Sequence, residues 1–257
     1  MKKTVISIIA ALVCIVSANA QTIVRNYQIS DFRSISASYL FSIEITCGDR
    51  YSVSVEAPNS FFDLIRVKKH ENNLDFSLKA ELPRRLRDLT DKIIVNITMP
   101  HLDGIELSGA CKVKGFGVFK SRGDEFKAEL SGASRITDLC IEAPKVDVEI
   151  DGASRAEINV NTGEVEAELS GASKLTLSGY TPKIELDLSG ASAADTKVIE
   201  CNDVSVDASG ASRALVNAQK ILKVELSGAS KCEYIGPEEL NLRIDSISGA
   251  STLKRLN

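Results

Sequence analysis

Apolar and polar residues alternate along most of the chain with a period of two. In "VEAELSGASKLTL" the apolar residues Val165, Ala167 and Leu169 alternate with glutamates, and the leucines of "KLTL" alternate with Lys and Thr. Such alternation is typical of short strands with one buried and one exposed face. The repeated part of the chain offers no helical spacing of apolar residues, so we expect an all-β fold.

A short motif, SGAS, separates the alternating stretches and returns about every 20 residues. Its glycine recurs eight times, with gaps of 18 to 23 residues, at Gly109, Gly132, Gly152, Gly171, Gly190, Gly210, Gly228 and Gly249. A fixed period of this size is the signature of a solenoid. Short strands and tight corners in each unit predict a right-handed parallel β-helix (β-solenoid) of about 20-residue coils with an N-terminal strand-rich cap, because parallel crossovers are overwhelmingly right-handed.

We interpret SGAS as a corner of the coil and not as a catalytic serine motif. Stacked coils place the same position directly above itself, so a corner that requires glycine requires it in every coil. The alanine stays small because neighbouring corners pack closely. The two flanking serines can bond along the stack or to backbone groups of the corner.

The first 20 residues read as a signal peptide. Lys2 and Lys3 precede an apolar stretch, and Ala18-Asn19-Ala20 forms a small-x-small site, so we predict cleavage after Ala20. No later apolar run has transmembrane length, and we therefore expect an exported protein of the periplasm or cell surface. Residues 21–257 should form one domain, with the cap and first coils in 21–100 and the SGAS-repeat coils in 101–257. Within the first part we interpret "LPRRLRDLTD" as a loop.

Charge and cysteine content narrow the classes of function. The chain has 31 Lys and Arg against 35 Asp and Glu, a formal net charge of −4 with both signs interspersed, which argues against a nucleic-acid partner. Five cysteines would survive cleavage, at Cys47, Cys111, Cys140, Cys201 and Cys232. They form no CxxC pair, so neither a zinc knuckle nor a redox motif is indicated, and we expect most of them to be buried and unpaired.

Two rows of charge should run along the solenoid. Three residues before the motif glycines stand Glu106, Glu129, Glu149, Glu168, Asp187, Asp207, Glu225 and then Ser246. Three residues after them stand Lys112, Arg135, Arg155, Lys174, Ala193, Arg213, Lys231 and Thr252. The alternation places both rows outward, where the basic row would offset repulsion within the acidic row. An active site breaks a repeat locally, and this pattern is uniform.

The residues predict no catalytic, cofactor-binding or metal-binding site. The only histidines, His70 and His101, lie outside the regular coils, and no GxSxG motif accompanies the many serines. Carboxylates can bind Ca²⁺ or hydrolyse glycosides, but the nonapeptide of calcium-binding β-rolls is absent. The chain has no Trp, so a dedicated carbohydrate platform is not marked either.

Three stretches carry a resemblance to a known family. "FRSISASYLFSIEITCGDRYSVSVEAP", then "IIVNITMPHLDGIELSGACKVKG", then iterated LSGAS resemble the family described as "putative auto-transporter adhesin, head GIN domain". The resemblance covers essentially the whole chain after residue 20. It implies a secreted, pectin-lyase-like β-helix with a role in cell adhesion and no established activity. It supplies no functional residues to carry over.

The most favoured function is therefore an exported, non-enzymatic β-solenoid that serves adhesion or structure at the cell surface or in the envelope. The alternative is a polysaccharide-binding or polysaccharide-cleaving β-helix, because this fold hosts such enzymes. The partner would be an envelope protein or a glycan. A homo-oligomer formed through the C-terminal coil is a further expectation, because an open coil exposes unpaired backbone groups.

Overall fold

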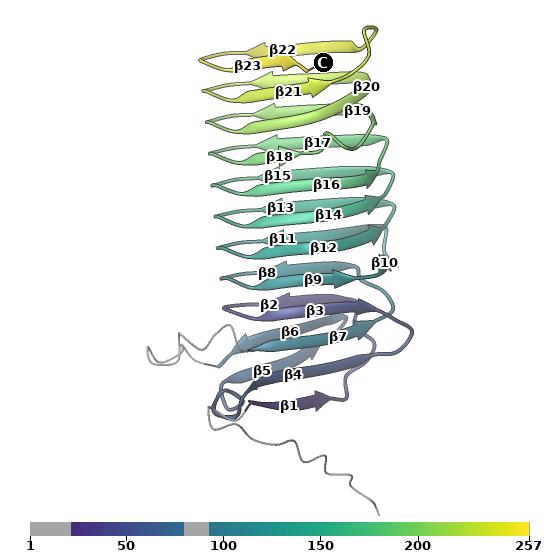
Figure 1. Cartoon of the computed structure of the whole chain (residues 1–257), viewed down its shortest axis with the longest axis vertical. Helices are drawn as coiled ribbons and strands as arrows, with labels where there is room; N and C mark the ends of the chain where they lie inside the picture. The colour runs from purple at the N-terminus through teal and green to yellow at the C-terminus, as the bar shows by residue number, and fades with distance from the viewer. Residues whose placement is uncertain (1–21, 80–92, 257) are drawn as a thin grey trace, which may run out of the picture.

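The computed structural model describes residues 22–79 and 93–256, and in these residues the chain forms a stack of coils (Figure 1). Each regular coil has two strands lying face to face and joined by the SGAS corner. We name the strands before the corner the leading sheet and the strands after it the trailing sheet. Strands of successive coils pair in parallel, residue by residue, within each sheet. The predicted β-solenoid with coils of about 20 residues is confirmed.

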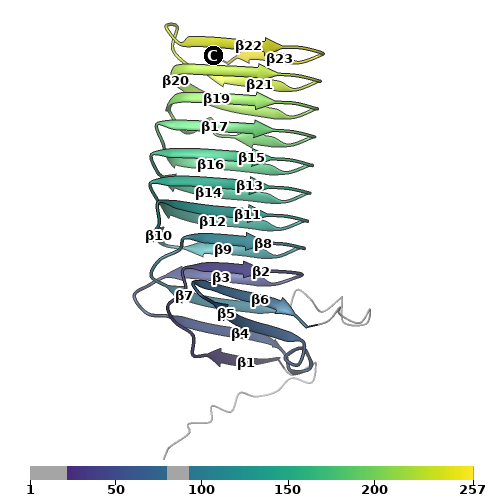
Figure 2. The same ribbon diagram turned by 180° about the vertical axis from the view of Figure 1, so that it is seen from behind.

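Each sheet runs the length of the stack, as the view from behind also shows (Figure 2). From the N-terminal end, the leading sheet is built from β5 (Ile65–His70), β6 (Asn73–Leu78), β2 (Ser34–Ala37), β8 (Gly104–Leu107), β11 (Glu125–Leu130), β13 (Lys145–Ile150), β15 (Glu164–Leu169), β17 (Lys183–Leu188), β19 (Cys201–Ala208), the second half of β20 (Arg213–Leu226) and β22 (Asn241–Ile247). The trailing sheet is built from β1 (Thr22–Tyr27), β4 (Ser52–Pro58), β7 (Ile94–Met99), β3 (Ser42–Cys47), β9 (Lys112–Phe116) with β10 (Val118–Lys120), β12 (Arg135–Glu142), β14 (Arg155–Asn161), β16 (Lys174–Tyr180), β18 (Ala193–Asp195), the first half of β20, β21 (Lys231–Ile235) and β23 (Thr252–Arg255). A single 3₁₀ turn, η1 (Asn59–Phe61), follows β4.

The core lies between the two sheets and follows from the alternation. In β15 the side chains of Val165, Ala167 and Leu169 are buried, and those of the intervening glutamates are not. Because coils stack in register, each inward side chain lies above its equivalent in the coil below. Burying an apolar side chain of this size contributes about 1.5–3 kcal/mol, so the stacked interior is the main source of stability.

The glycine of each SGAS corner is required by its backbone conformation and by the coil below. Gly171 has φ +71, and a Cβ built on it would lie 2.6 Å from the carbonyl oxygen of Gly152. That carbonyl instead accepts a hydrogen bond from the backbone N–H of Ala172, at 2.7 Å. The same bond recurs at each successive corner, so the corners form a continuous ladder of their own. The interpretation of SGAS as a corner of the coil is confirmed.

The N-terminal coils do not stack in the order of the sequence. The coil formed by β2 and β3 lies between the coil of β6 and β7 and the coil of β8 and β9 (Figure 1). Beyond β6 and β7, the pairing becomes antiparallel: β5 pairs with β6, and β4 lies between β7 and β1. These antiparallel strands lie against the first parallel coil and form the N-terminal end of the stack.

Two predictions concern residues outside the described part of the chain. The signal peptide at 1–20 and the loop "LPRRLRDLTD" at 82–91 both fall there, and the division of one domain into 21–100 and 101–257 also stays a prediction. Across residues 22–79 and 93–256, no helix has the length and apolarity that a membrane crossing requires.

Candidate binding surface on the leading sheet

The acidic row predicted from the sequence forms one unbroken column on the leading sheet. Glu129 lies directly opposite Glu106 on one side and Glu149 on the other. The register continues through the remaining carboxylates and ends at Ser246. We name the seven carboxylates the acidic column: Glu106, Glu129, Glu149, Glu168, Asp187, Asp207 and Glu225. Its members are exposed or half-buried, so their predicted outward placement is confirmed.

A groove follows the acidic column beside the SGAS corners. Its volume is about 550 Å³, and it extends over six coils. Column carboxylates form its wall, and the first residue of six motifs borders it, which is a serine in five of them and Asp151 in the third. One of these serines, Ser170, donates a hydrogen bond to Asp151 at 2.7 Å. The groove therefore presents a carboxylate and a small polar group once per coil, at the strand spacing of about 4.8 Å. Sequence reasoning found the column but not this hollow.

Lysines of the leading sheet neutralise part of the acidic charge. Lys127 contacts Glu149 at 2.8 Å and Glu129 at 2.9 Å, and both contacts raise the pKa of its ammonium group. Exposed pairs of this kind contribute only about 0–1 kcal/mol each. These two column carboxylates thus pair within their own sheet, whereas the sequence predicts compensation by the basic row across the corner.

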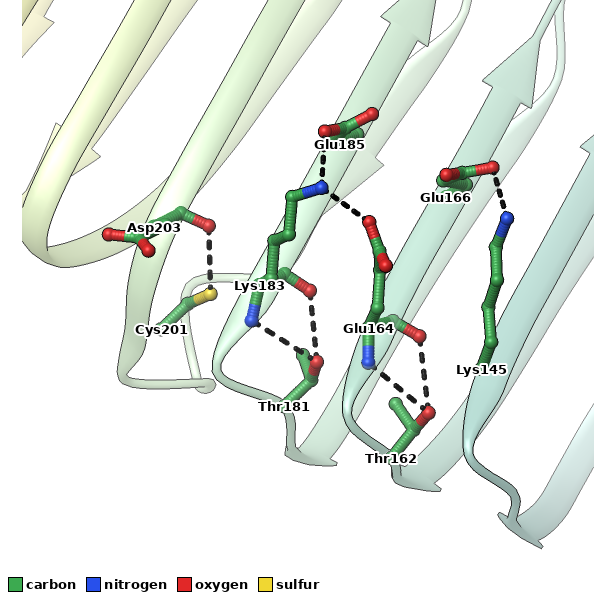
Figure 3. A network of polar contacts seen from close by, with 9 residues as sticks. All are labelled: Lys145, Thr162, Glu164, Glu166, Thr181, Lys183, Glu185, Cys201 and Asp203. Carbon is green, nitrogen blue, oxygen red and sulfur yellow. Dashed lines mark hydrogen bonds and ion pairs between the residues drawn. The ribbon is translucent and has the colours of Figure 1, made fainter. Parts of the chain in front are cut away.

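A second network lies farther from the corner, at the start of the leading strands (Figure 3). Lys183 contacts Glu164 at 2.5 Å and Glu185 at 2.7 Å. Lys145 contacts Glu166 at 2.6 Å, so the pairs bridge three successive coils. Carboxylate oxygens of Glu164, Glu166 and Glu185 lie within 4.8 Å of one another, a spacing that suits a metal ion. Because both lysines already neutralise this group, we interpret it as an ion-pair network.

Beside this network, a side-chain ladder supports the edge opposite the SGAS corners (Figure 3). Thr162 donates to the carbonyl of Glu164 at 3.1 Å, and Thr181 donates to that of Lys183 at 2.9 Å. Cys201 takes the same place one coil later, with its sulfur 3.3 Å from the carbonyl oxygen of Asp203. Sequence reasoning missed this second corner, although its residues recur at the same period as SGAS.

The middle of the acidic column is electrostatically unfavourable in the free protein. Burial raises the pKa of Asp187, and the neighbouring carboxylates Asp207 and Glu168 raise it further. Among the residues described, none of these three side chains forms an ion pair. Within the described residues, Glu129 and Glu149 are thus the column carboxylates that form ion pairs, and Glu168, Asp187 and Asp207 follow them in the groove without one.

The basic row lies on the trailing sheet as predicted, and it is interrupted there. Lys112, Arg135, Arg155 and Lys174 stand in register, followed by Ala193 and then by Arg213 and Lys231. The two rows thus flank the same corners from opposite sheets. A smaller hollow of about 340 Å³ follows the last four positions of this row, from Ala193 to Thr252.

The two histidines lie at the edge opposite the SGAS corners. His70 pairs with Asn73 at the start of β6, and His101 forms a β-bridge with Lys120. Neither is positioned to activate a serine of the motif. All five cysteines of the described chain are free thiols, and burial raises the pKa of Cys111 to about 11 and of Cys232 to about 12.

The sequence of the chain matches a known protein family. The family described as "putative auto-transporter adhesin, head GIN domain" matches residues 31–237. The chain belongs to this family. The match begins after β1 and includes the other N-terminal strands and seven of the eight motif glycines. A comparison with curated proteins finds no match.

Solved structures share the fold of this head GIN domain protein. A putative adhesin from Parabacteroides merdae superposes with a TM-score of 0.82 at 16% identity, covering 93% of this chain and 98% of its own. A putative adhesin from Parabacteroides distasonis gives 0.79 at 16% identity, covering 92% and 98%. A putative lipid binding protein from Parabacteroides distasonis gives 0.78 at 14% identity, covering 93% and 98%. At these identities the likeness establishes the fold alone.

Proposed function

We propose that the protein is an exported, non-enzymatic adhesion protein of the periplasm or cell surface, and that the groove along the acidic column is its contact surface. One observation carries the proposal: the groove repeats the same chemistry in six successive coils. A long partner with a repeating group can therefore engage several coils at once, and weak contacts add through one chain. Membership of the head GIN domain family supports the adhesive role.

The chemistry of the groove favours a partner rich in cations or hydroxyl donors. Carboxylates accept hydrogen bonds from ammonium, guanidinium and hydroxyl groups, and these bonds are stronger than those between neutral groups. An extended envelope glycan or a basic segment of an envelope protein offers such donors along its length. Binding would also relieve the repulsion that Asp187 experiences from its neighbours.

Binding measurements on a charge-neutralised groove test this proposal. The double variant Glu168→Gln and Asp187→Asn removes two charges from the central column and leaves the shape nearly unchanged. The matched control Glu157→Gln and Glu200→Gln removes the same charge from exposed positions outside the groove. A glycan array and pull-downs from envelope extract should show binding for the wild-type protein and the control, and weakened binding for the groove variant. Equal binding by both variants would refute the groove as the contact surface.

A second candidate, cleavage of a polysaccharide, rests on Asp187. A glycosidase needs a carboxyl group with a raised pKa beside a second carboxylate, and burial, with Asp207 and Glu168 as neighbours, raises the pKa of Asp187. Release of reducing ends from a panel of polysaccharides measures this activity directly. Activity of the wild-type protein that disappears in Asp187→Asn would favour this candidate. A wild-type protein that binds a polysaccharide without releasing reducing ends would favour adhesion.

A further inference from the structure

The C-terminal coil exposes side chains that every earlier coil buries. Leu242, Ile244 and Ile247 of β22 are 36%, 51% and 41% exposed. Their register partners one coil below, in β20, are Leu222, Val224 and Leu226, and each of these is fully buried. The exposed apolar surface thus lies on β22, and not on the final residues that follow the last motif.

The same coil also presents two open strand edges. Within the described residues, β22 pairs only with β20, and β23 pairs only with β21. The two edges lie side by side at the C-terminal end of the stack (Figures 1 and 2). Unpaired strand edges of this kind are templates for pairing with another chain.

We propose that two copies of the protein pair through this coil, C-terminal end to C-terminal end, about a twofold axis that runs perpendicular to the sheets. Such an axis reverses the strand direction and keeps each sheet on its own side. It therefore sets β22 antiparallel to β22 of the second copy and, at the same time, β23 antiparallel to β23. Both sheets continue across the junction.

The register of the last coil places one axis through both sheets. Ile244 pairs with Val224, which lies four residues before Gly228. Leu253 pairs with Cys232, which lies four residues after Gly228. Ile244 and Leu253 therefore stand at matching distances from the corner, and both belong to inward-facing rows. One axis can pack Ile244 against its counterpart and Leu253 against its counterpart.

Charge complementarity supports this axis. With Ile244 on the axis, Arg243 lies opposite Asp245 of the second copy, and the pair occurs twice. Asp245 is the residue at which the register with β20 shifts, and its carboxylate also contacts Lys223 of its own chain at 3.0 Å. Moving the axis by one residue would place Arg243 or Asp245 opposite its own counterpart, where like charges repel. On the trailing sheet, Thr252 lies opposite Lys254. Residues 236–256 carry three acidic and three basic side chains. The C-terminal end therefore has no net charge, and two such ends do not repel each other through a net charge.

The opposite end of the stack is less suited to such pairing. Its outer leading strand, β5, carries Arg66, Lys68 and Lys69. Basic residues on an edge strand are a common means of preventing association between edges. We therefore assign the second copy's C-terminal coil, and not its N-terminal strands, as the occupant of the open coil.

Sedimentation equilibrium of the processed wild-type protein and matched variants tests the dimer. Ile244→Lys places two ammonium groups on the axis and should raise the dimer Kd at least about tenfold. Val198→Lys, at an apolar residue that is 62% exposed elsewhere on the stack, should leave it unchanged. Thermal unfolding of each variant separates a loss of pairing from a loss of folding.

Three further variants keep the test decisive if Ile244→Lys unfolds. Arg243→Glu should weaken the dimer, and the exchanged pair Arg243→Glu with Asp245→Arg should restore it. Ile244→Cys should form a disulfide between two copies under mild oxidation. A wild-type protein that stays monomeric at every concentration would overturn the proposal. So would a dimer that survives Ile244→Lys and is lost with Val24→Lys at the opposite end.

Discussion

Substitution of a corner glycine in mid-stack should destabilise the solenoid strongly. In Gly171→Val, the backbone of the valine must adopt φ +71, a left-handed conformation that costs an L-residue about 1–2 kcal/mol. The new Cβ would lie 2.6 Å from the oxygen and 3.0 Å from the nitrogen of Gly152, so the corner must shift against a backbone ladder. Overpacking of this kind adds about 1–3 kcal/mol.

The net expectation for Gly171→Val is a loss of roughly 2–4 kcal/mol, after allowing for the reduced freedom of the unfolded chain. For a protein of this length, that corresponds to a melting temperature lower by about 4–16 °C. Urea and thermal unfolding followed by far-UV circular dichroism would measure it.

Two variants serve as matched controls for the corner. Gly123→Ala changes a loop glycine whose added Cβ would meet nothing closer than 3.4 Å, so its stability should be nearly that of the wild type. Ser173→Ala removes a buried hydroxyl that has no hydrogen-bond partner, so it should be neutral or slightly stabilising. If Gly171→Val unfolds together with the wild type and both controls, the corner does not require glycine.

Three further predictions use the charges and thiols. Asp187→Asn should stabilise the protein at neutral pH, because a carboxyl group with a raised pKa destabilises the fold only when it is ionised. This gain in stability should disappear below about pH 3.8, and urea unfolding curves at neutral pH and below pH 3.8 would measure it. Lys183→Met should cost less than about 1 kcal/mol, and less still in high salt, as salt titration of the urea midpoint would reveal. Cys111 and Cys232 should resist alkylation at neutral pH in the folded protein and react after denaturation, as mass spectrometry can follow.

The regular coils could be predicted from the sequence because two local signals agree. Alternation of apolar and polar residues sets the inward and outward faces, and the glycine spacing sets which residues stack. Together these two signals predict that Glu168 lies opposite Asp187, and the observed register is the same. The groove could not be predicted in this way, because its shape depends on how far the corner serines and column side chains stand from the sheet.

The inserted coil of β2 and β3 could not be predicted because its corner lacks the motif. Tyr39 stands where Gly109 stands in the next coil, and it adopts φ +82, a rare conformation for a residue with a side chain. Only the flanking pattern matches: Ile35 and Ala37 before the corner correspond to Ile105 and Leu107. The stacking order then depends on pairing between distant strands, which alternation alone does not specify.

The proposed binding role draws on the uneven compensation of the acidic column. Stacking in register places like charges one strand spacing apart, so a long acidic column destabilises the fold by repulsion between neighbouring carboxylates. At Glu129 and Glu149 the chain offsets this cost with Lys127. At Glu168, Asp187 and Asp207 it provides no ion pair within the described residues, and the pKa of Asp187 is raised by burial first and by the neighbouring carboxylates second. A partner that brings cations or hydroxyl donors to these coils replaces repulsion with charge-assisted hydrogen bonds. If the groove binds such a partner as proposed, the unfavourable electrostatics of the free protein would contribute to the binding energy, and the coils of Glu168, Asp187 and Asp207 should contribute most.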